Sequence, residues 1–364
     1  MKRFITLTLF IPFITSCLIM KPAMTNGQAQ KQLRVAIPAA DPGDRNNNFY
    51  DNVELYDLPL SVLTVTGEVE NPGPVDFSRL PVRTVIVKEA LLNPDGTNRF
   101  IGAYRYDGYS LFDILQDYVL DKKNKETFRP IIDLYVVIEN DKGEQVVLSW
   151  GEIYYPSCLH QIIVATRVGR IVPSKTKDLW PLPAEGKLVV VNDLITERNL
   201  SNPVKITVCS YSRSFAINRE LSPLYSPGFT IEADGAKGPV VTSLPAGYQT
   251  ETLHTIFYGK GRGIHSTQPF SGIFLHELLA KSVPVSPDAL KHGLVAAAGI
   301  DGYRSVYTYS EIMNRNDQAA VLLVPCDTCT DGGKYRLFPS CDFFSDRAVK
   351  SLSEIIVTTQ PERK

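Results

Sequence analysis

The 364-residue sequence has no surplus of either charge, because 38 Lys and Arg residues are matched by 39 Asp and Glu residues and the net charge is −1. A protein that binds nucleic acid through surface charge needs a basic excess or a basic stripe, so this balance argues against a nucleic-acid partner. Methionine is scarce, with 4 residues, whereas 17 Tyr, 16 Phe and 25 Pro residues are typical of a chain rich in strands and turns. A hydrophobic content of 44% supports packed cores and excludes a wholly disordered or collagen-like chain. The length predicts about two domains, at roughly 150 residues per domain.

Long apolar runs are missing after the first twenty residues, so no later segment reaches the ~20 residues that a membrane span needs. The run Phe4–Met20 follows a cationic start at residues 1–3 and precedes a polar segment with small residues up to Ala29. This order is typical of a secretory signal peptide, and we expect cleavage after residue 29. Two alternatives are a bacterial lipoprotein with Cys17 lipidated, and a retained anchor. The protein is therefore expected to be exported to the periplasm or cell envelope of a bacterium, and in the lipoprotein alternative it would be attached to a membrane through a lipid anchor at Cys17.

Cysteine is also scarce, with 6 residues, and one of them is Cys17. Cys326 and Cys329 have C-x-x-C spacing, but no second C-x-x-C or His-x-x-His completes a zinc set, so no metal site is expected. In the oxidising compartment that export implies, we expect a structural disulfide among Cys326, Cys329 and Cys341. It would join Cys326 to Cys329, or either of them to Cys341. Free thiols and a metal or redox role are the alternatives.

One order of predicted elements occurs twice: a strand, a short amphipathic helix, a hairpin with a second short helix, and closing strands. The helix expected at 110–119 corresponds to one at 272–279, and the second short helix carries Glu152 in one half and Glu311 in the other. Agreement of several successive elements indicates an internal duplication. We therefore expect a signal peptide at 1–29, a polar N-terminal arm at 30–56, similar domains at 57–212 and 226–360, and a linker at 213–225.

Three short motifs follow one another in the first half: Val65–Pro72, then Leu80-Pro81, then Tyr106–Gly108 directly before the apolar helix near Leu111. In this order they resemble the molybdopterin-binding domain of the sulfite oxidase family of oxidoreductases. The resemblance implies an α+β fold of mixed, strand-rich architecture, present in two tandem copies.

The resemblance covers about residues 60–210 and, more loosely, residues 229–357. Active members of the family bind molybdenum through a cysteine after the second strand, since the metal takes a soft thiolate ligand. Residues 87–100 of the first copy contain no cysteine, and Tyr258 stands at the equivalent place in the second copy. The resemblance therefore implies a catalytically degenerate relative for which no cofactor is expected. The alternatives are an active molybdopterin-dependent oxidoreductase with an unusual metal ligand, and a structural cell-envelope protein.

Glycines and cations gather at that place in the second copy, in Gly259-Lys260-Gly261-Arg262, with His265 close behind. Glycines at a turn expose backbone N–H groups to an anion, and the cations add charge-assisted hydrogen bonds. The segment is no P-loop, because no Gly-Lys-Ser/Thr follows at the required spacing. A glycine-rich turn with solvated cations and a retained pterin site are the alternatives. The predicted ligand-binding residues are Tyr258, Gly259, Lys260, Gly261, Arg262 and His265.

Arg198 and Arg347 occupy matching places in the two halves, which suits either ligand binding or a shared structural salt bridge. No catalytic set is identified, because the sequence has no Gly-x-Ser-x-Gly elbow and His160 stands apart from other candidates. The sequence thus favours a binding protein over an enzyme. Its expected partner is an anionic small molecule or a protein of the cell envelope.

Overall fold

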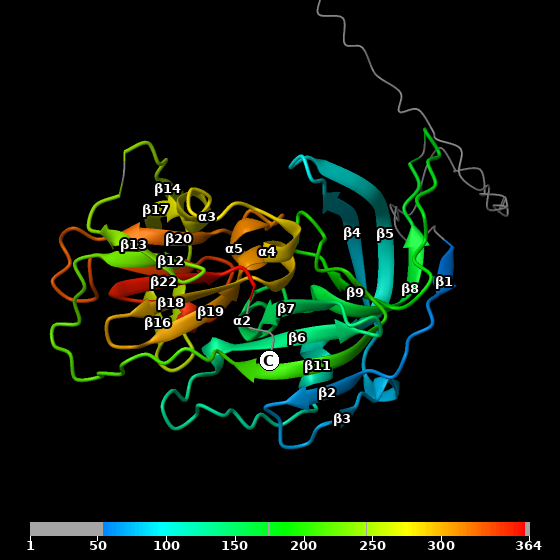
Figure 1. Ribbon diagram of the computed structural model, residues 1–364, viewed down its shortest axis with the longest axis horizontal. Coiled ribbons are helices and arrows are strands. Elements are labelled where there is room, and N and C mark those ends of the chain that lie inside the picture. Colours follow the sequence, from blue (N-terminus) through cyan, green and yellow to red (C-terminus); the bar gives the residue numbers. More distant parts are fainter. Residues whose placement is uncertain (1–53, 174, 245, 361–364) are drawn as a thin grey trace, which may run out of the picture. The chain divides into compact units, whose positions relative to one another are not determined.

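The structure, a computed structural model, describes residues 54–173, 175–244 and 246–360 (Figure 1). The expected signal peptide, the lipidation candidate Cys17 and almost all of the expected arm at 30–56 lie outside these residues. The described residues belong to one unit, Arg45–Lys364. Within them, no helix is long and apolar enough to cross a membrane.

The α+β fold class expected from the sequence is wrong. The described residues are 42% strand and 11% helix, and their small sheets are arranged like the blades of a four-bladed β-propeller, not as two sulfite-oxidase-like units. The α-helices of the described residues have five or six residues each, about one and a half turns, which is too short to cover a sheet. They are α1 (Leu111–Leu115), α2 (Trp150–Tyr154), α3 (Leu275–Leu279), α4 (Pro287–His292) and α5 (Tyr309–Met313).

The expected helices are longer than the observed ones, because the helical spacing of apolar residues continues across strand–helix boundaries. The helix expected at 272–279 begins as the end of a strand, β17 (Phe270–Phe274), and only its second part is α3. The helix expected at 110–119 ends at Leu115. Ser110, the last residue of β5 (Asn98–Ser110), caps it by accepting a hydrogen bond from the backbone N–H of Asp113. The buried apolar residues near the boundary therefore belong to two kinds of element.

One five-stranded sheet in each half has the same strand order, β3-β2-β11-β6-β7 in the first and β13-β12-β22-β18-β19 in the second (Figure 1). In both sheets the second and third strands are parallel, and all other neighbours are antiparallel. The two halves therefore share a topology. The strands are β2 (Thr64–Gly67), β3 (Gly73–Pro74), β6 (Leu134–Asn140), β7 (Gln145–Ser149), β11 (Pro203–Ser210), β12 (Phe229–Ala233), β13 (Ala236–Val241), β18 (Leu294–Gly299), β19 (Arg304–Thr308) and β22 (Leu352–Thr358).

The second sheet of each half also matches, with β9-β8-β5-β4 in the first and β21-β20-β17-β14 in the second. The first half extends this sheet by β10 beside β9 and by β1 beside β8. The strands are β1 (Leu55–Asp57), β4 (Arg83–Leu92), β8 (Ile162–Arg170), β9 (Lys187–Val190), β10 (Leu200–Ser201), β14 (Glu251–Leu253), β20 (Val321–Pro325) and β21 (Tyr335–Pro339), and the 3-10 helices are η1 (Phe77–Arg79), η2 (Ile131–Asp133) and η3 (Ser345–Arg347).

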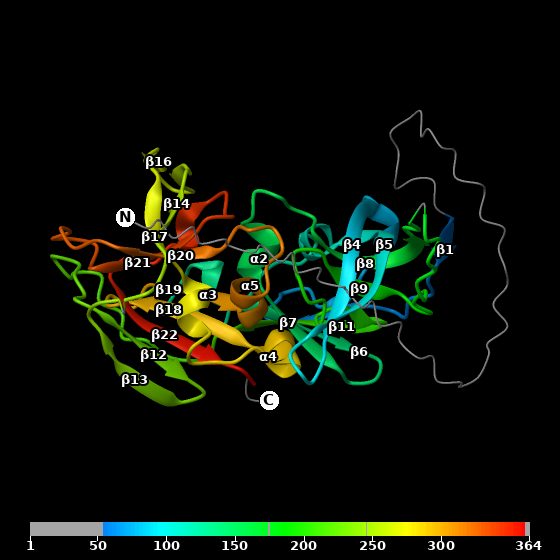
Figure 2. The ribbon, with the colours of Figure 1, turned by 90° about the horizontal axis from the view of Figure 1, so that it is seen from above.

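A two-stranded hairpin of β15 (Phe257–Gly259) and β16 (Gly263–Ser266) lies between β14 and β17, and Figure 2 shows β16 close to β14. Residues 251–266 thus form three short strands, β14, β15 and β16. Each half has its own apolar core, one formed by residues between 63 and 208 and one by residues between 195 and 357. The bounds of the two expected domains remain a prediction.

Candidate functional site

All six residues of the predicted ligand site lie in the β15–β16 hairpin or its turn. Tyr258 and Gly259 end β15, Lys260 to Arg262 form the turn, and His265 is on β16. Gly263 has a φ of 73°, in the left-handed region that favours glycine, so the turn itself explains this residue. The backbone N–H of Lys260 donates to Asp346 Oδ2 at 3.1 Å. That carboxylate occupies a donor that a bound anion would otherwise use.

The ring of His265 packs across Gly259. A Cβ atom at Gly259 would lie 2.7 Å from His265 Nε2, so glycine lets the ring lie in its present position. The centroid of the ring is 5.2 Å from that of Phe257. Local packing therefore accounts for both Gly259 and His265.

The cations of the hairpin are exposed. Lys260, Arg262 and His265 all face solvent. An ion pair formed by exposed side chains contributes about 0–1 kcal/mol, because water screens it and two long side chains must be ordered. A small anion bound here would stay in contact with water and gain little from these charges.

Large apolar side chains are also exposed on the hairpin and beside it. Tyr258, which is 37% exposed, lies opposite Ile264, which is 67% exposed, in the strand register. The Tyr258 ring is 5.8 Å from that of Phe343, which is 56% exposed. Exposed apolar side chains that gather on one surface are typical of interaction sites. We call Tyr258, Ile264, Phe343 and Ile256, which is 59% exposed, the hairpin patch.

The hairpin does not fit a molybdenum site. Tyr258, which stands where the family ligand was expected, presents an exposed phenol, and residues 256–266 contain no thiol. Across residues 54–173, 175–244 and 246–360, no group of three or more His, Cys, Asp or Glu side chains is arranged to hold a metal ion.

Arg198 and Arg347 are buried completely, with side-chain exposures of 1% and 0%. Arg198 donates to both oxygens of Asp193, at 2.8 and 2.6 Å, and to both oxygens of Glu152, at 2.9 and 3.0 Å. Such paired N–H···O bonds hold a planar guanidinium in one orientation.

Arg347 repeats this arrangement in the second half. It donates to both oxygens of Asp342, each at 2.7 Å, and its Nη1 lies 2.6 Å from Glu311 Oε1. In each half the aspartate is five residues before the arginine, and the glutamate lies in the short helix that follows the hairpin. A Cβ at Gly151 would lie 2.2 Å from Arg347 Nη1, so this glycine makes room for the guanidinium.

We call each buried arginine with its two carboxylates an arginine centre: Arg198 with Asp193 and Glu152, and Arg347 with Asp342 and Glu311. The two arginine centres are connected through the N-caps of α2 and α5. Ser149 caps α2 and donates to Glu311, at 2.8 Å, while Thr308 caps α5 and donates to Glu152, at 3.2 Å. Arg198 Nη1 also donates to Thr308 Oγ1 at 3.0 Å. Each half thus completes the hydrogen bonding of the other.

The connected centres contain more carboxyl groups than guanidinium groups, with Glu152, Asp193, Glu311 and Asp342 around Arg198 and Arg347. Burial raises the pKa of Glu152, Asp193 and Asp342, although the paired guanidinium groups act in the opposite direction. Both arginines are ion-paired with protein carboxylates and shielded from solvent, while Arg347 Nη1 and Glu311 Oε1 lie close together without forming a hydrogen bond. Their geometry is that of structural salt bridges.

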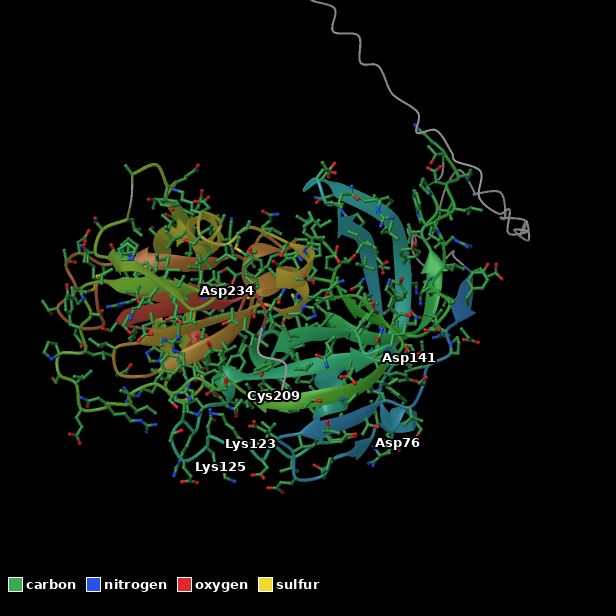
Figure 3. All side chains as sticks on the ribbon, in the orientation of Figure 1. Asp76, Lys123, Lys125, Asp141, Cys209 and Asp234 are labelled. Atoms are coloured by element: carbon green, nitrogen blue, oxygen red, sulfur yellow. A yellow bond between two sulfur atoms is a disulfide. The ribbon has the colours of Figure 1, made fainter. Side chains whose placement is uncertain are left out.

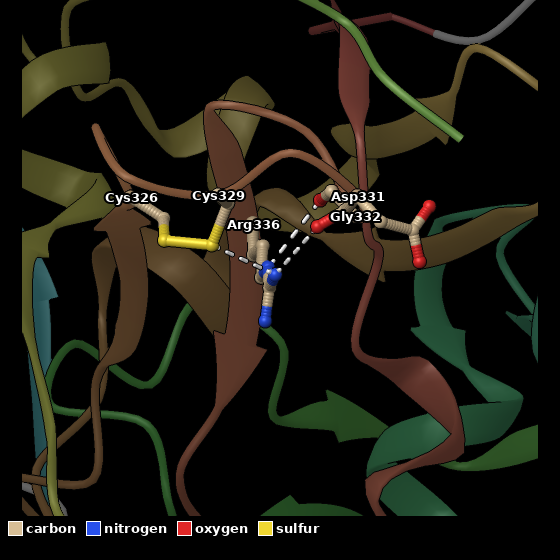
Figure 4. The surroundings of a disulfide bond; sticks show 5 residues. All are labelled: Cys326, Cys329, Asp331, Gly332 and Arg336. Carbon is tan, nitrogen blue, oxygen red and sulfur yellow. Dashed lines mark hydrogen bonds between the residues drawn. A yellow bond between two sulfur atoms is a disulfide. The ribbon is translucent and has the colours of Figure 1, made fainter. Parts of the chain in front are cut away.

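The disulfide pairs Cys326 with Cys329 (Figure 4). Arg336 lies beside it and donates to Cys329 Sγ at 3.1 Å and to the carbonyl oxygen of Asp331 at 3.1 Å. Cys341 is a separate thiol whose pKa is raised by burial. Cys209 is half-buried on β11 (Figure 3).

The sequence missed a polar cluster at the start of α1. His160 Nδ1 is 3.0 Å from Ser110 Oγ and 3.4 Å from Asp113 Oδ2. Arg83 holds Asp113 through two hydrogen bonds, at 2.9 and 3.2 Å. His160 is distant in sequence from Ser110 and Asp113, and the pairing of β5 with β8 brings them together. The sequence offers one sign of this cluster, since Cys158 stands two residues before His160. In the structure both residues line the same small cavity.

A scan against protein-family models gives no match for this chain, and a search of curated proteins gives none either.

Proposed function

We propose that the protein is an exported binding protein that attaches to an acidic surface of a cell-envelope protein through the hairpin patch. The observation that carries the proposal is the composition of the patch. It combines large exposed apolar side chains with Lys260 and Arg262 in its turn, and residues 256–266 contain no acidic residue.

A protein partner suits this surface better than a small anion does. A partner would remove Ile264 and Phe343 from water, and full burial of one such side chain contributes about 1.5–3 kcal/mol. It would also exclude water from Lys260 and Arg262, which strengthens their attraction to carboxylates. A small anion would contact only the exposed cations and leave the apolar side chains in water.

The test places a photo-crosslinking amino acid at position 264 of the full chain in its native host, and at position 240 as a control. Val240 is also a large exposed apolar residue, 60% exposed, but it lies on β13. We expect one envelope protein to cross-link at position 264 and not at 240. Equal cross-linking at the two positions would contradict the proposal.

Calorimetry with the purified partner then measures the contribution of each group. We expect Ile264→Ser and Phe343→Ser each to weaken binding at least tenfold, and Val240→Ser to leave it unchanged. Binding should also weaken as salt rises, because Lys260 and Arg262 contribute through charge. Unchanged affinity in both patch variants would overturn the assignment of the surface.

A further inference from the structure

The Cys326–Cys329 disulfide lies in the loop at residues 326–334, which joins β20 to β21 in the second half of the chain. Both cysteines are half-buried, and the side chain of Asp327 between them is 80% exposed. The disulfide therefore lies at the surface of the second half, at a place that another molecule can approach.

Backbone hydrogen bonds hold this loop in place together with the disulfide. The N–H of Cys326 donates to the carbonyl oxygen of Lys334 at 2.7 Å. The N–H of Gly332 donates to the carbonyl oxygen of Leu224, also at 2.7 Å. The disulfide joins cysteines only three positions apart, so it constrains the unfolded chain less than a bond across a longer loop would. The loop can therefore keep its shape when the sulfur–sulfur bond is open.

The guanidinium group of Arg336 points at one of the two sulfur atoms. Its Nη2 donates to Cys329 Sγ and to the carbonyl oxygen of Asp331, each at 3.1 Å, and its Nε donates to the carbonyl oxygen of Gly332 at 3.3 Å (Figure 4). A Cβ atom at Gly332 would lie 2.6 Å from Arg336 Nη2, so this glycine makes room for the guanidinium. The loop thus fixes a cation against Cys329.

The charge of Arg336 is not neutralised by a carboxylate. Its hydrogen-bond partners are two carbonyl oxygens and a sulfur, and no ion pair among residues 54–173, 175–244 and 246–360 includes it. The carboxylate of Asp331 points away from the disulfide and accepts from the backbone N–H of Leu224 at 2.9 Å (Figure 4). That of Asp327 lies 3.5 Å from Lys334 Nζ. An anion at Cys329 would therefore meet a cation that has no other anionic partner.

Reduction of the disulfide would create such an anion. A cation beside a cysteine stabilises the thiolate over the thiol, because the charge of the thiolate is then compensated. A disulfide whose reduced form is stabilised in this way is a stronger oxidant, and a sulfur that is stable as a thiolate is also the better leaving group. Arg336 therefore favours opening of the bond with Cys329 as the sulfur that leaves.

We propose that the Cys326–Cys329 disulfide oxidises a dithiol by thiol–disulfide exchange, with Arg336 stabilising the Cys329 thiolate. One thiolate of the dithiol attacks Cys326 Sγ, the sulfur–sulfur bond of the protein breaks, and Cys329 leaves as a thiolate. The second thiolate of the dithiol attacks the substrate sulfur of this mixed disulfide, and Cys326 leaves and takes up a proton. Two electrons pass to the protein. The second proton of the dithiol enters the solvent.

The test equilibrates the full-length protein with dihydrolipoamide, a dithiol, and lipoamide, its cyclic disulfide. Thiols are then alkylated, and peptide mass spectrometry measures the fraction of chains in which Cys326 and Cys329 are reduced. In an equimolar mixture at about pH 8 we expect most chains to be reduced, with one dihydrolipoamide oxidised per chain. Arg336→Met should lower the equilibrium constant for reduction at least tenfold. The difference should shrink at about pH 5, because a protonated Cys329 gains little from a cation.

Arg79→Met is the matched control, because it removes an exposed arginine at the end of η1 and should leave the equilibrium unchanged. Thermal unfolding of each variant shows whether it is folded. A second measurement needs no variant: in the reduced wild-type protein, Cys329 should become reactive towards iodoacetamide at a pH about one unit or more below that of Cys326.

Three results would each overturn the proposal. The first is a disulfide that stays closed in the equimolar mixture, as expected for a purely structural bond. The second is a folded Arg336→Met variant with the wild-type equilibrium constant at about pH 8. The third is a reduced wild-type protein in which Cys326 and Cys329 become reactive at the same pH.

Discussion

The two halves of the chain share the order of their matching strands, and one connection between matching strands differs strongly in length. In the first half, β4 and β5 are joined by a turn at residues 93–97, whereas in the second half the matching strands, β14 and β17, are joined by residues 254–269, which include the β15–β16 hairpin. Strand pairing constrains the interior of both halves, while a surface connection can change length at little cost. The surface that we propose for partner binding lies where the halves differ.

The basic residues of the molecule show the same contrast. Arg198 and Arg347 occur at equivalent places in both halves, are fully buried and are ion-paired with carboxylates. Lys260 and Arg262 occur only in the inserted hairpin and face solvent. A basic residue repeated in both halves therefore marks the shared interior, and one confined to a single half marks the surface that is specific to it.

The largest effect is expected from Arg347→Met. It leaves Asp342 and Glu311 buried without their cation, and breaking a buried ion pair in this way costs about 3–5 kcal/mol. Arg198→Met should lower the free energy of unfolding by a similar amount if the two centres are equivalent, and Arg262→Met should lower it little. Denaturant unfolding measures the free energy of unfolding of the three variants. A loss below 1 kcal/mol for Arg347→Met would contradict the difference between buried and exposed arginines.

A smaller loss is expected for Gly151→Ala. The new Cβ would lie 2.2 Å from Arg347 Nη1, and such overpacking of a buried site costs about 1–3 kcal/mol. Gly73→Ala is the control, because no atom lies within 4 Å of a Cβ at that position. Equal stability of the two variants in denaturant unfolding would show that the Arg347 centre can rearrange.

The pH dependence of stability should reveal the excess of carboxyl groups in the arginine centres. Burial raises the folded-state pKa of Glu152, Asp193 and Asp342, so their contribution to stability is present below the unfolded-state pKa and is lost as the pH rises through the folded-state values. Replacing Glu152 by Gln removes one of these groups. We expect the unfolding free energy of the wild type to fall relative to that of Glu152→Gln as the pH increases from 4 to about 8, and a constant difference would contradict this.

The smallest effect is expected at the hairpin. Inorganic phosphate should stabilise the wild-type protein by less than about 1 kcal/mol in a thermal-shift measurement, because Lys260 and Arg262 are exposed. The Lys260→Ala/Arg262→Ala variant should unfold at nearly the same temperature as the wild type. A large stabilisation by phosphate that the double variant loses would instead assign the hairpin to a small anion.

Local patterns predicted the hairpins well and the helices poorly. The hairpin expected before the second short helix of each half is confirmed, as β6–β7 and β18–β19, because alternating apolar residues beside a turn define an antiparallel pair. The expected helices were too long, since buried residues at a strand–helix boundary imitate helical spacing. From these overlong helices and short motifs, the fold class was assigned wrongly.

The candidate sites divide in the same way. The hairpin residues are contiguous, so the family resemblance and local composition together identified Tyr258 to His265 as one candidate. The cluster of Ser110, Asp113 and His160 could not be found in this way, because its members come from separate elements that only the pairing of β5 with β8 makes neighbours.

The sequence by itself specified short-range features: the paired strands of the β6–β7 and β18–β19 hairpins, the glycine turn at Lys260 to Arg262, and the matching positions of Arg198 and Arg347. These depend on residues close together in the chain or on repetition along it. The tertiary structure decided which cations are buried, which glutamate lies beside each arginine, and that the caps of α2 and α5 donate hydrogen bonds to the glutamate of the opposite half. Burial and partner choice depend on how distant segments pack, and packing sets both the cost of removing a charge from water and the group that offsets it.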